Sequence, residues 1–213
     1  MKKSKIIILI FIIIILILLG IIIKLKIKDN QKQDIISDAI KFKRDFEELN
    51  GAQTFSGETY NEVNIISNNP IKYVNLEELV NIINTEEAYI YISSPNCPYC
   101  RATIESLLEV ANQLNINKIY YYDAFQDNYY SKENYENLMK QLQEKNIVRY
   151  TDDEKWQWGI PALLKVNKGK ISFNISGIAY KLEEGQSKYD QLTEEQKALV
   201  YDRYYKVLSE NIY

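Results

Sequence analysis

The chain carries a pair of cysteines, Cys97 and Cys100, separated by two residues. Such a pair can close a small disulfide and exchange it with an external thiol or disulfide. The sequence holds no other Cys and no His among its 213 residues. Histidine acid-base catalysis, Cys-His nucleophile pairs and His-containing metal sites are therefore excluded together. The segment Cys97-Pro98-Tyr99-Cys100 predicts thiol-disulfide exchange.

The residues after this motif indicate which sulfur reacts first. Apolar residues recur at helical spacing, at Ile104, Leu107, Leu108, Ala111 and Leu114. Pro98 then falls in the first turn of a helix, where proline is tolerated. Cys97 stands at the helix N-terminus, where the helix dipole and unpaired N–H groups favour its thiolate. We predict that Cys97 attacks a substrate disulfide and that Cys100 resolves the mixed disulfide.

Two alternatives to redox use of the pair are a zinc half-site and a static disulfide. A structural zinc ion needs about four ligands, and the sequence has no further Cys and no His to supply them. A static bridge that closes so short a loop stabilises little. We therefore predict a redox-active pair and no metal. Arg101 either adds positive charge beside the thiolate or is an ordinary solvated helix residue.

The segments around the motif predict an α/β fold. Ala88 to Ile92 is typical of a strand buried on both faces, and Ile119 to Tyr122 is typical of the next strand. A helix is expected to begin near Ser131, and the alternation of strands and helices implies parallel pairing. Ala162 to Val166 and Ile171 to Ile175 flank turn residues and predict an antiparallel hairpin. The result is a central mixed sheet flanked by helices.

Further helices and a strand are predicted at the borders of this core. Capping-box signatures begin helices after Asn75 and after Thr193. For the last helix, the predicted buried face comprises Ala198, Tyr201, Tyr205 and Leu208. A juxtamembrane helix is expected from Ile35 to Leu49, and Glu62 to Ile66 is typical of a short strand.

The N-terminus predicts a membrane anchor. Ile6 to Ile23 contains only Ile and Leu apart from Phe11 and Gly20, and its 18 residues would rise about 27 Å as a helix. Basic residues follow it, whereas a cleaved signal peptide, the alternative, has a shorter apolar core and small residues. The short N-terminal flank predicts a single-pass protein of the cell membrane with its C-terminal body outside the cytoplasm. The predicted domains are 1–28 (anchor), 29–61 (juxtamembrane helix and linker) and 62–213.

Charge excludes one class of partner. The first 28 residues hold six Lys and no acidic residue, which leaves 20 basic and 29 acidic residues from Asp29 onward, a net charge of −9. Nucleic-acid binding requires clustered Lys and Arg. We therefore predict no nucleic-acid partner.

The chain resembles the thioredoxin superfamily. The likeness rests on Cys97-Pro98-Tyr99-Cys100 after a strand and on Gly159-Ile160-Pro161 before another, and it spans about Val63 to Leu208. It implies a thioredoxin-like fold with a cis bond before Pro161, beside the cysteines, where Ile160 offers backbone hydrogen bonds to a substrate chain. Ile160 and Pro161 are thus predicted substrate-binding residues. The alternative is an ordinary proline that starts a strand.

The anchor and the length resemble membrane-anchored extracytoplasmic thiol-disulfide oxidoreductases of Gram-positive bacteria, which include the bacteriocin-transport accessory type. This resemblance implies protein or peptide thiols and disulfides as substrates and an electron-transfer partner in the membrane. The sequence has no flavin or nicotinamide fingerprint, so no cofactor is predicted. Two alternatives stay open, a non-catalytic adaptor or chaperone for secreted peptides, and metal delivery through the dithiol.

The sequence departs from the family in two places. The family's buried acid, six residues before the first Cys in thioredoxin, corresponds here to Tyr91, which leaves the proton of Cys100 without an acceptor. The stretch from Asn146 to Trp158 lengthens the route to Pro161 and brings Trp156 and Trp158 close to it in sequence. These Trp residues either line a substrate groove or pack against the domain.

Overall fold

The structure is a computed structural model, and it describes residues 13–22, 24, 38–125, 136–144, 148–150 and 156–209. After a helix of residues 38–47, the elements are β1 (Ile71–Tyr73), α2 (Leu76–Thr85), β2 (Glu87–Ser93), α3 (Pro98–Gln113), β3 (Ile119–Asp123), α4 (Glu136–Glu144), β4 (Val148–Tyr150), β5 (Trp156–Trp158), β6 (Ala162–Asn167), β7 (Lys170–Ser176) and α5 (Glu194–Ser209).

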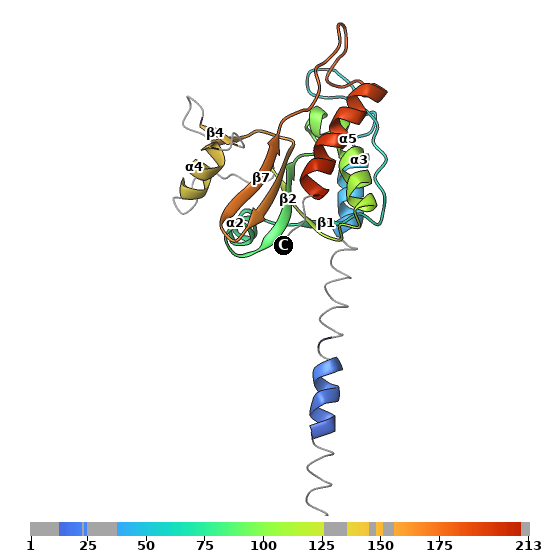
Figure 1. The fold of residues 1–213 in the computed structure, drawn as a ribbon. Helices are drawn as coiled ribbons and strands as arrows, with labels where there is room; N and C mark the ends of the chain where they lie inside the picture. Colours follow the sequence, from blue (N-terminus) through green and yellow to red (C-terminus); the bar gives the residue numbers. More distant parts are fainter. Residues whose placement is uncertain are drawn as a thin grey trace, which may run out of the picture.

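The central sheet is mixed, as predicted. Its strand order is β1-β3-β2-β6-β7. The first three strands are parallel, whereas β6 is antiparallel to both β2 and β7. Figure 1 shows β2 and β7 within the body, with α3 and α5 beside them. The α/β class and the parallel pairing of the two strands that flank α3 are confirmed.

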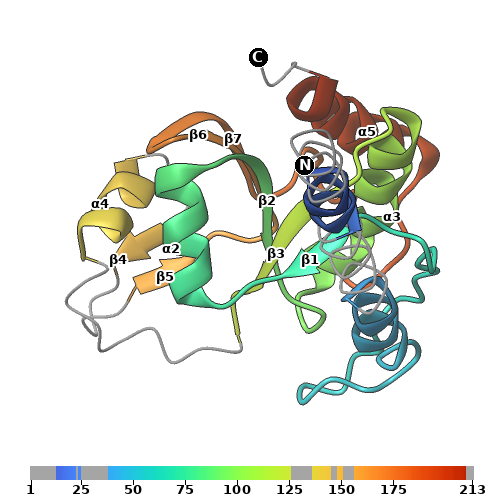
Figure 2. The same cartoon turned by 90° about the horizontal axis from the view of Figure 1, so that it is seen from below.

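Helices cover both faces of this sheet because successive strand residues point to opposite sides. Tyr89, Tyr91 and Tyr121 pack against α3, α5 and the helix of residues 38–47. Ile90 and Ile92, the alternate residues of β2, pack against α2 and α4. Figure 2 shows these two groups of helices on opposite sides of the strands. We name the two sides the α3 face and the α2 face.

Glu62 to Ile66 does not form the predicted strand. The alternation of buried and exposed residues along this segment is present, since Val63 and Ile65 are buried. Their backbone groups, however, bond to side chains. Asn50 pairs with both the N–H and the C=O of Val63 at 2.9 Å, and the Ile65 N–H donates to Glu47 Oε1 at 2.8 Å. Side chains of the last helical residue, Glu47, and of the turn after it thus replace a neighbouring strand.

Local signals predicted helix starts and the hairpin correctly. The capping box at Asn75 is present, and Thr193 forms the expected reciprocal bonds with Gln196 at the start of α5. Lys168 and Gly169 connect β6 to β7 with φ values of 44° and 89°. Positive φ at both central residues is the conformation that a two-residue hairpin turn favours.

The predicted face of α5 is wrong at Ala198 and Tyr205, correct at Leu208 and correct in part at Tyr201, which packs against the core of the α3 face. The buried residues of this helix are Gln196, Val200, Tyr204, Val207 and Leu208. Tyr205 is 39% exposed, and Tyr201 is half-buried. Tyrosines at three nearby positions fit two helical faces, so periodicity alone did not separate them.

The segment between β3 and β6 is more structured than predicted. α4 confirms the expected helix from residue 136 onward, and residues 131–135 lie outside the described residues. β4 and β5 form a separate two-stranded antiparallel sheet. Met139 and Leu142 of α4 and Trp158 of β5 pack onto the α2 face. The stretch before Pro161 therefore adds a layer of packing.

The predicted anchor lies largely outside the described residues. Of Ile6 to Ile23, the structure describes residues 13–22, which are helical. Among the residues described, no helix combines the length and the apolar character required to cross a bilayer. Most of the juxtamembrane helix is present as residues 38–47, and Phe42 and Phe46 belong to the core of the α3 face. The predicted domain limits stay predictions.

Candidate active site

The cysteine pair lies where β2 gives way to α3. The Cys97 N–H donates to the Ser94 carbonyl at 3.1 Å, which closes a turn after the end of β2. Cys97 is the N-cap of α3, and Pro98 occupies the first helical turn. Proline suits this position because its missing N–H has no intrahelical partner there. The predicted order of strand, cysteine turn and helix is confirmed.

The two thiols have different access to solvent. Both cysteines are free, and the Cys100 N–H donates to Cys97 Sγ at 3.3 Å. Cys97 retains 7% exposure, whereas Cys100 has none. An external disulfide can therefore reach only Cys97 without a rearrangement of the site.

The two thiols also differ in acidity. A hydrogen bond from the Cys100 thiol lowers the pKa of Cys97, and it outweighs the opposing effect of burial. The backbone N–H groups of Cys100 and Tyr99 and the positive charge of Lys188 lower the pKa further. Burial raises the pKa of Cys100 well above its usual value, and the neighbouring Cys97 adds to this. Since the thiolate is the nucleophile, these differences favour Cys97 as the attacking sulfur, and its catalytic role stays a prediction.

Arg101 follows the pair but is not a solvated helix residue, so that interpretation is wrong. It is 1% exposed, and burial lowers its pKa to about 10. Its guanidinium donates to the Phe46 carbonyl at 2.6 Å, to the Asn61 carbonyl at 2.7 Å and to Asn50 Oδ1 at 2.7 Å. Arg101 thus joins α3 to the preceding segment of the chain. A role for its charge at the thiolate stays a prediction.

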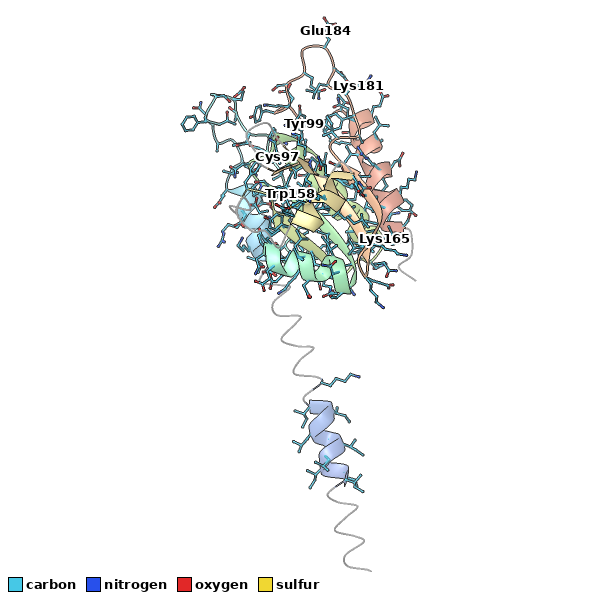
Figure 3. All side chains as sticks on the ribbon, turned by 90° about the vertical axis from the view of Figure 1, so that its left-hand side faces the viewer. Cys97, Tyr99, Trp158, Lys165, Lys181 and Glu184 are labelled. Carbon is cyan, nitrogen blue, oxygen red and sulfur yellow. The ribbon has the colours of Figure 1, made fainter. Side chains whose placement is uncertain are left out.

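Aromatic residues from two distant loops lie around Cys97. Tyr60 donates its hydroxyl proton to the Asn96 carbonyl at 3.2 Å, and its ring meets that of Tyr189 edge-on at 5.7 Å. Burial, followed by the nearby Tyr99 and both cysteines, raises the pKa of Tyr180 to about 12. Figure 3 shows Cys97 and Tyr99 in the upper part of the body, below the loop that carries Lys181 and Glu184. Sequence reasoning missed these residues because their loops contain no motif.

Ile160 and Pro161 lie at the same end of the sheet as the cysteine turn. The peptide bond between them is cis, as the resemblance implied. The Pro161 carbonyl accepts a hydrogen bond from the Gly177 N–H at 2.8 Å. The next residue, Ala162, pairs with Ile92 near the end of β2. Ile160 is half-buried and Pro161 is buried. Their predicted role in substrate binding stays a prediction.

Trp158 packs against the domain. It is 6% exposed, and its ring lies 5.5 Å from that of Tyr122 within the core of the α2 face. This favours the packing interpretation over a substrate groove for Trp158. The side chain of Trp156 lies outside the described residues.

Tyr91 and its neighbours surround Cys100 in the interior. Tyr91 is fully buried, and burial raises its pKa well above the usual value, with contributions from Tyr204 and Cys100. Ser93 on the same face of β2 is also fully buried. Tyr91 therefore stays protonated and cannot replace a carboxylate as a base. Sequence reasoning recognised the missing acid but found no substitute.

The fold and the site together define an α/β domain with a Cys-x-x-Cys pair at the N-terminus of a helix that follows a central strand. Comparison with protein-family models, with curated proteins and with solved structures found no match. In the part of the chain that the structure describes, no group of three or more potential metal ligands is present.

Proposed function

We propose that this chain is a membrane-anchored thiol-disulfide oxidoreductase with a thioredoxin-like fold. Its substrates would be extracytoplasmic proteins or peptides, with which it exchanges disulfides through Cys97 and Cys100. The observation that carries the proposal is the asymmetry of the pair. One sulfur is slightly accessible with a lowered pKa, and the other is fully buried with a raised pKa. A static disulfide has no need of such a difference.

The asymmetry assigns an order to the chemistry. The Cys97 thiolate attacks one sulfur of a substrate disulfide, and the other substrate sulfur leaves as a thiolate. Cys100 then loses its proton and attacks Cys97 Sγ. The mixed disulfide breaks, the Cys97–Cys100 disulfide forms, and the second substrate thiolate departs. The substrate gains two electrons and the protein loses two. The reverse sequence oxidises a substrate dithiol.

The positions of Ile160 and Pro161 suit a substrate chain. Pro161 lies at the end of the sheet where the cysteine turn leaves β2, and Ile160 is half-buried. In this proposal the backbone of Ile160 holds an extended substrate segment beside Cys97. Main-chain contacts of this kind bind many sequences, which suits an enzyme that acts on several proteins.

The proposed anchor is Ile6 to Ile23, with the body outside the cytoplasm. The apolar run and the absence of small residues after it support this assignment. Electrons would come from, or pass to, a redox partner in the same membrane. Protease added to intact protoplasts is expected to digest the body. Complete protection would contradict the orientation.

The decisive experiment is the reduction potential of the pair, measured on the full chain in detergent against glutathione and thioredoxin-type redox buffers. A value of about −270 mV indicates a reductase, whereas about −120 mV indicates an oxidase. Cys97→Ser is the control, and it must abolish the exchange. A pair that does not cycle would overturn the proposal and favour a thioredoxin-fold adaptor.

A further inference from the structure

Cys100 must lose a proton before it can resolve a mixed disulfide, yet no base is evident beside it. Its thiol is fully buried, and burial favours the protonated form. Tyr91 keeps its own proton, as shown above. The chemistry therefore requires another acceptor close to the end of β2.

Ser93 lies close to Cys100 at the end of β2. It is the last residue of β2, on the same face as Tyr91, and its hydroxyl lies close enough to stabilise the Cys100 thiolate. The hydroxyl is buried, and the hydroxyls of Tyr91 and Tyr121 also lie near it, but it makes no hydrogen bond of ordinary geometry with the described residues. It is therefore available both to accept a proton and to donate one.

Asp123 is the partner of Ser93 across the sheet. The two residues are paired in the parallel register of β2 and β3, and the Ala124 N–H donates to the Ser93 carbonyl at 2.9 Å. Side chains paired in this way point to the same face. Asp123 is 7% exposed, and its Oδ1 accepts the Phe125 N–H at 3.0 Å. A carboxylate therefore lies beside Ser93 with slight access to water.

We propose that Asp123 accepts the proton of Cys100 through the hydroxyl of Ser93, in place of the acid missing at Tyr91. The inference rests on the proposed function. Ser93 takes the thiol proton while it donates its own proton to the Asp123 carboxylate. The Cys100 thiolate then attacks Cys97 Sγ and displaces the substrate thiolate. Asp123 later releases the proton to water, so this proton transfer needs no further reactant, and the redox partner of the proposed function returns the Cys97–Cys100 disulfide to the dithiol.

The electrostatic surroundings of Asp123 suit a proton acceptor. Burial raises the pKa of this carboxyl, although the Phe125 N–H and the Ser94 hydroxyl lower it in part. A carboxylate with a raised pKa is a stronger base and lies closer in proton affinity to a thiol. Of the other titratable groups, Lys41 and Asp45 on the helix of residues 38–47 act on Asp123, and the charge of Asp123 in turn raises the pKa values of Tyr73 on β1 and Tyr121 on β3.

The test uses the full reduced chain in detergent and the chromogenic disulfide dithiobis(nitrobenzoate). Attack by Cys97 releases one coloured thiolate, and resolution by Cys100 releases a second. Stopped-flow absorbance separates the two releases. The first release tests the nucleophile of the proposed function, and the second tests the acceptor. Absence of a second release from the unaltered chain would overturn the proposed function together with this inference.

Asp123→Asn is expected to keep the first release and to slow the second about 100-fold at neutral pH, the scale of general base catalysis. The pH profile of the second release distinguishes this from structural damage. In the variant the rate should climb steadily into the alkaline range as the free thiol ionises, so the deficit shrinks with pH. An unchanged rate and profile in Asp123→Asn would overturn the inference.

Two further variants keep the test decisive. Ser93→Ala removes only the relay hydroxyl and should slow the second release in the same way. If Asp123→Asn also loses the first release, Ser93→Ala becomes the deciding variant. An unchanged pH profile of the second release in Ser93→Ala would contradict the relay. Asp45→Asn is the matched control, since it removes a neighbouring carboxylate that bonds to Lys41 and Tyr73. A deficit as large in Asp45→Asn would indicate a general charge effect and overturn the assignment.

Discussion

The two faces of the central sheet differ in what they bury. The α2 face is mostly aliphatic, with Leu79, Ile83, Ile90 and Leu164 at its centre. The α3 face buries Tyr91, Ser93, Tyr121, Cys100 and Arg101. β2, β3 and β6 contribute residues to both faces, because alternate residues of a strand point to opposite sides. The α2 face can therefore be optimised for packing while the α3 face holds polar groups. Substitutions on the α2 face should change mainly the stability of the fold, and substitutions on the α3 face should change mainly the thiol chemistry.

The largest effect is expected at the centre of the α3 face. Cys100→Ser removes the resolving sulfur, so the mixed disulfide on Cys97 should accumulate and the second release of coloured thiolate should vanish. Mass spectrometry of the intact chain detects the trapped adduct. Cys97→Ser is the control and should give no adduct. Turnover at the wild-type rate in Cys100→Ser would show that an external thiol resolves the intermediate.

The next largest effect is expected on the α2 face. Ile90 is fully buried, so Ile90→Ala should lower the free energy of unfolding by about 3 kcal/mol through lost burial and a residual cavity. Both coloured releases should keep their rates. Urea unfolding measures the stability.

Ile66→Ala is the matched control for Ile90→Ala because Ile66 is 45% exposed. It should change the free energy of unfolding by less than about 0.5 kcal/mol. Slower thiol chemistry in a folded Ile90→Ala variant would contradict the division of roles between the faces.

A smaller effect concerns how stability changes with pH on the α3 face. The pKa of Asp123 is higher in the folded chain than its ordinary value of 3.8. The folded state therefore holds this proton more tightly, and the stabilisation is lost as pH rises through the folded pKa. Asp123→Asn should not show this loss. The free energy of unfolding of the variant should therefore rise relative to that of the wild type from acid to neutral pH. Urea midpoints across that range measure it, and a constant difference would contradict the raised pKa.

The smallest effect is expected at the rim of the site. Lys188 lowers the pKa of Cys97 through its charge, and such exposed interactions are screened by salt. Lys188→Gln should raise the pKa of Cys97 slightly, with a smaller difference at high salt. Thiolate absorbance against pH measures it. Lys181→Gln is the control for a general loss of charge in the same loop. An equal rise in the pKa of Cys97 in Lys181→Gln would contradict a specific role of Lys188.

Sequence patterns predicted the parts of the site that depend on local structure. Cys97 and Cys100 were placed correctly because the strand, the proline and the helical periodicity all lie within a short stretch. Asp123 was missed because its role depends on the register between β2 and β3. Tyr60 and Tyr189 meet at Cys97 only through tertiary contacts between loops.

The errors in the predicted fold have a similar origin. The pattern at Val63 and Ile65 described burial correctly, but it did not identify the hydrogen-bond partners of the backbone. β4 and β5 are three residues each, too short for a periodic signal. Local sequence thus predicts where elements lie better than what satisfies their polar groups.

The bonds of Arg101 restrict where the chain can be shortened. All three of its acceptor residues, Phe46, Asn50 and Asn61, precede residue 62. A fragment that begins at residue 62 would leave the buried guanidinium of Arg101 without these acceptors. Such a loss typically lowers the free energy of unfolding by several kcal/mol. Arg101, next to the resolving cysteine, would then have to form its hydrogen bonds with water. A minimal folding unit with an intact redox site should therefore begin before residue 38.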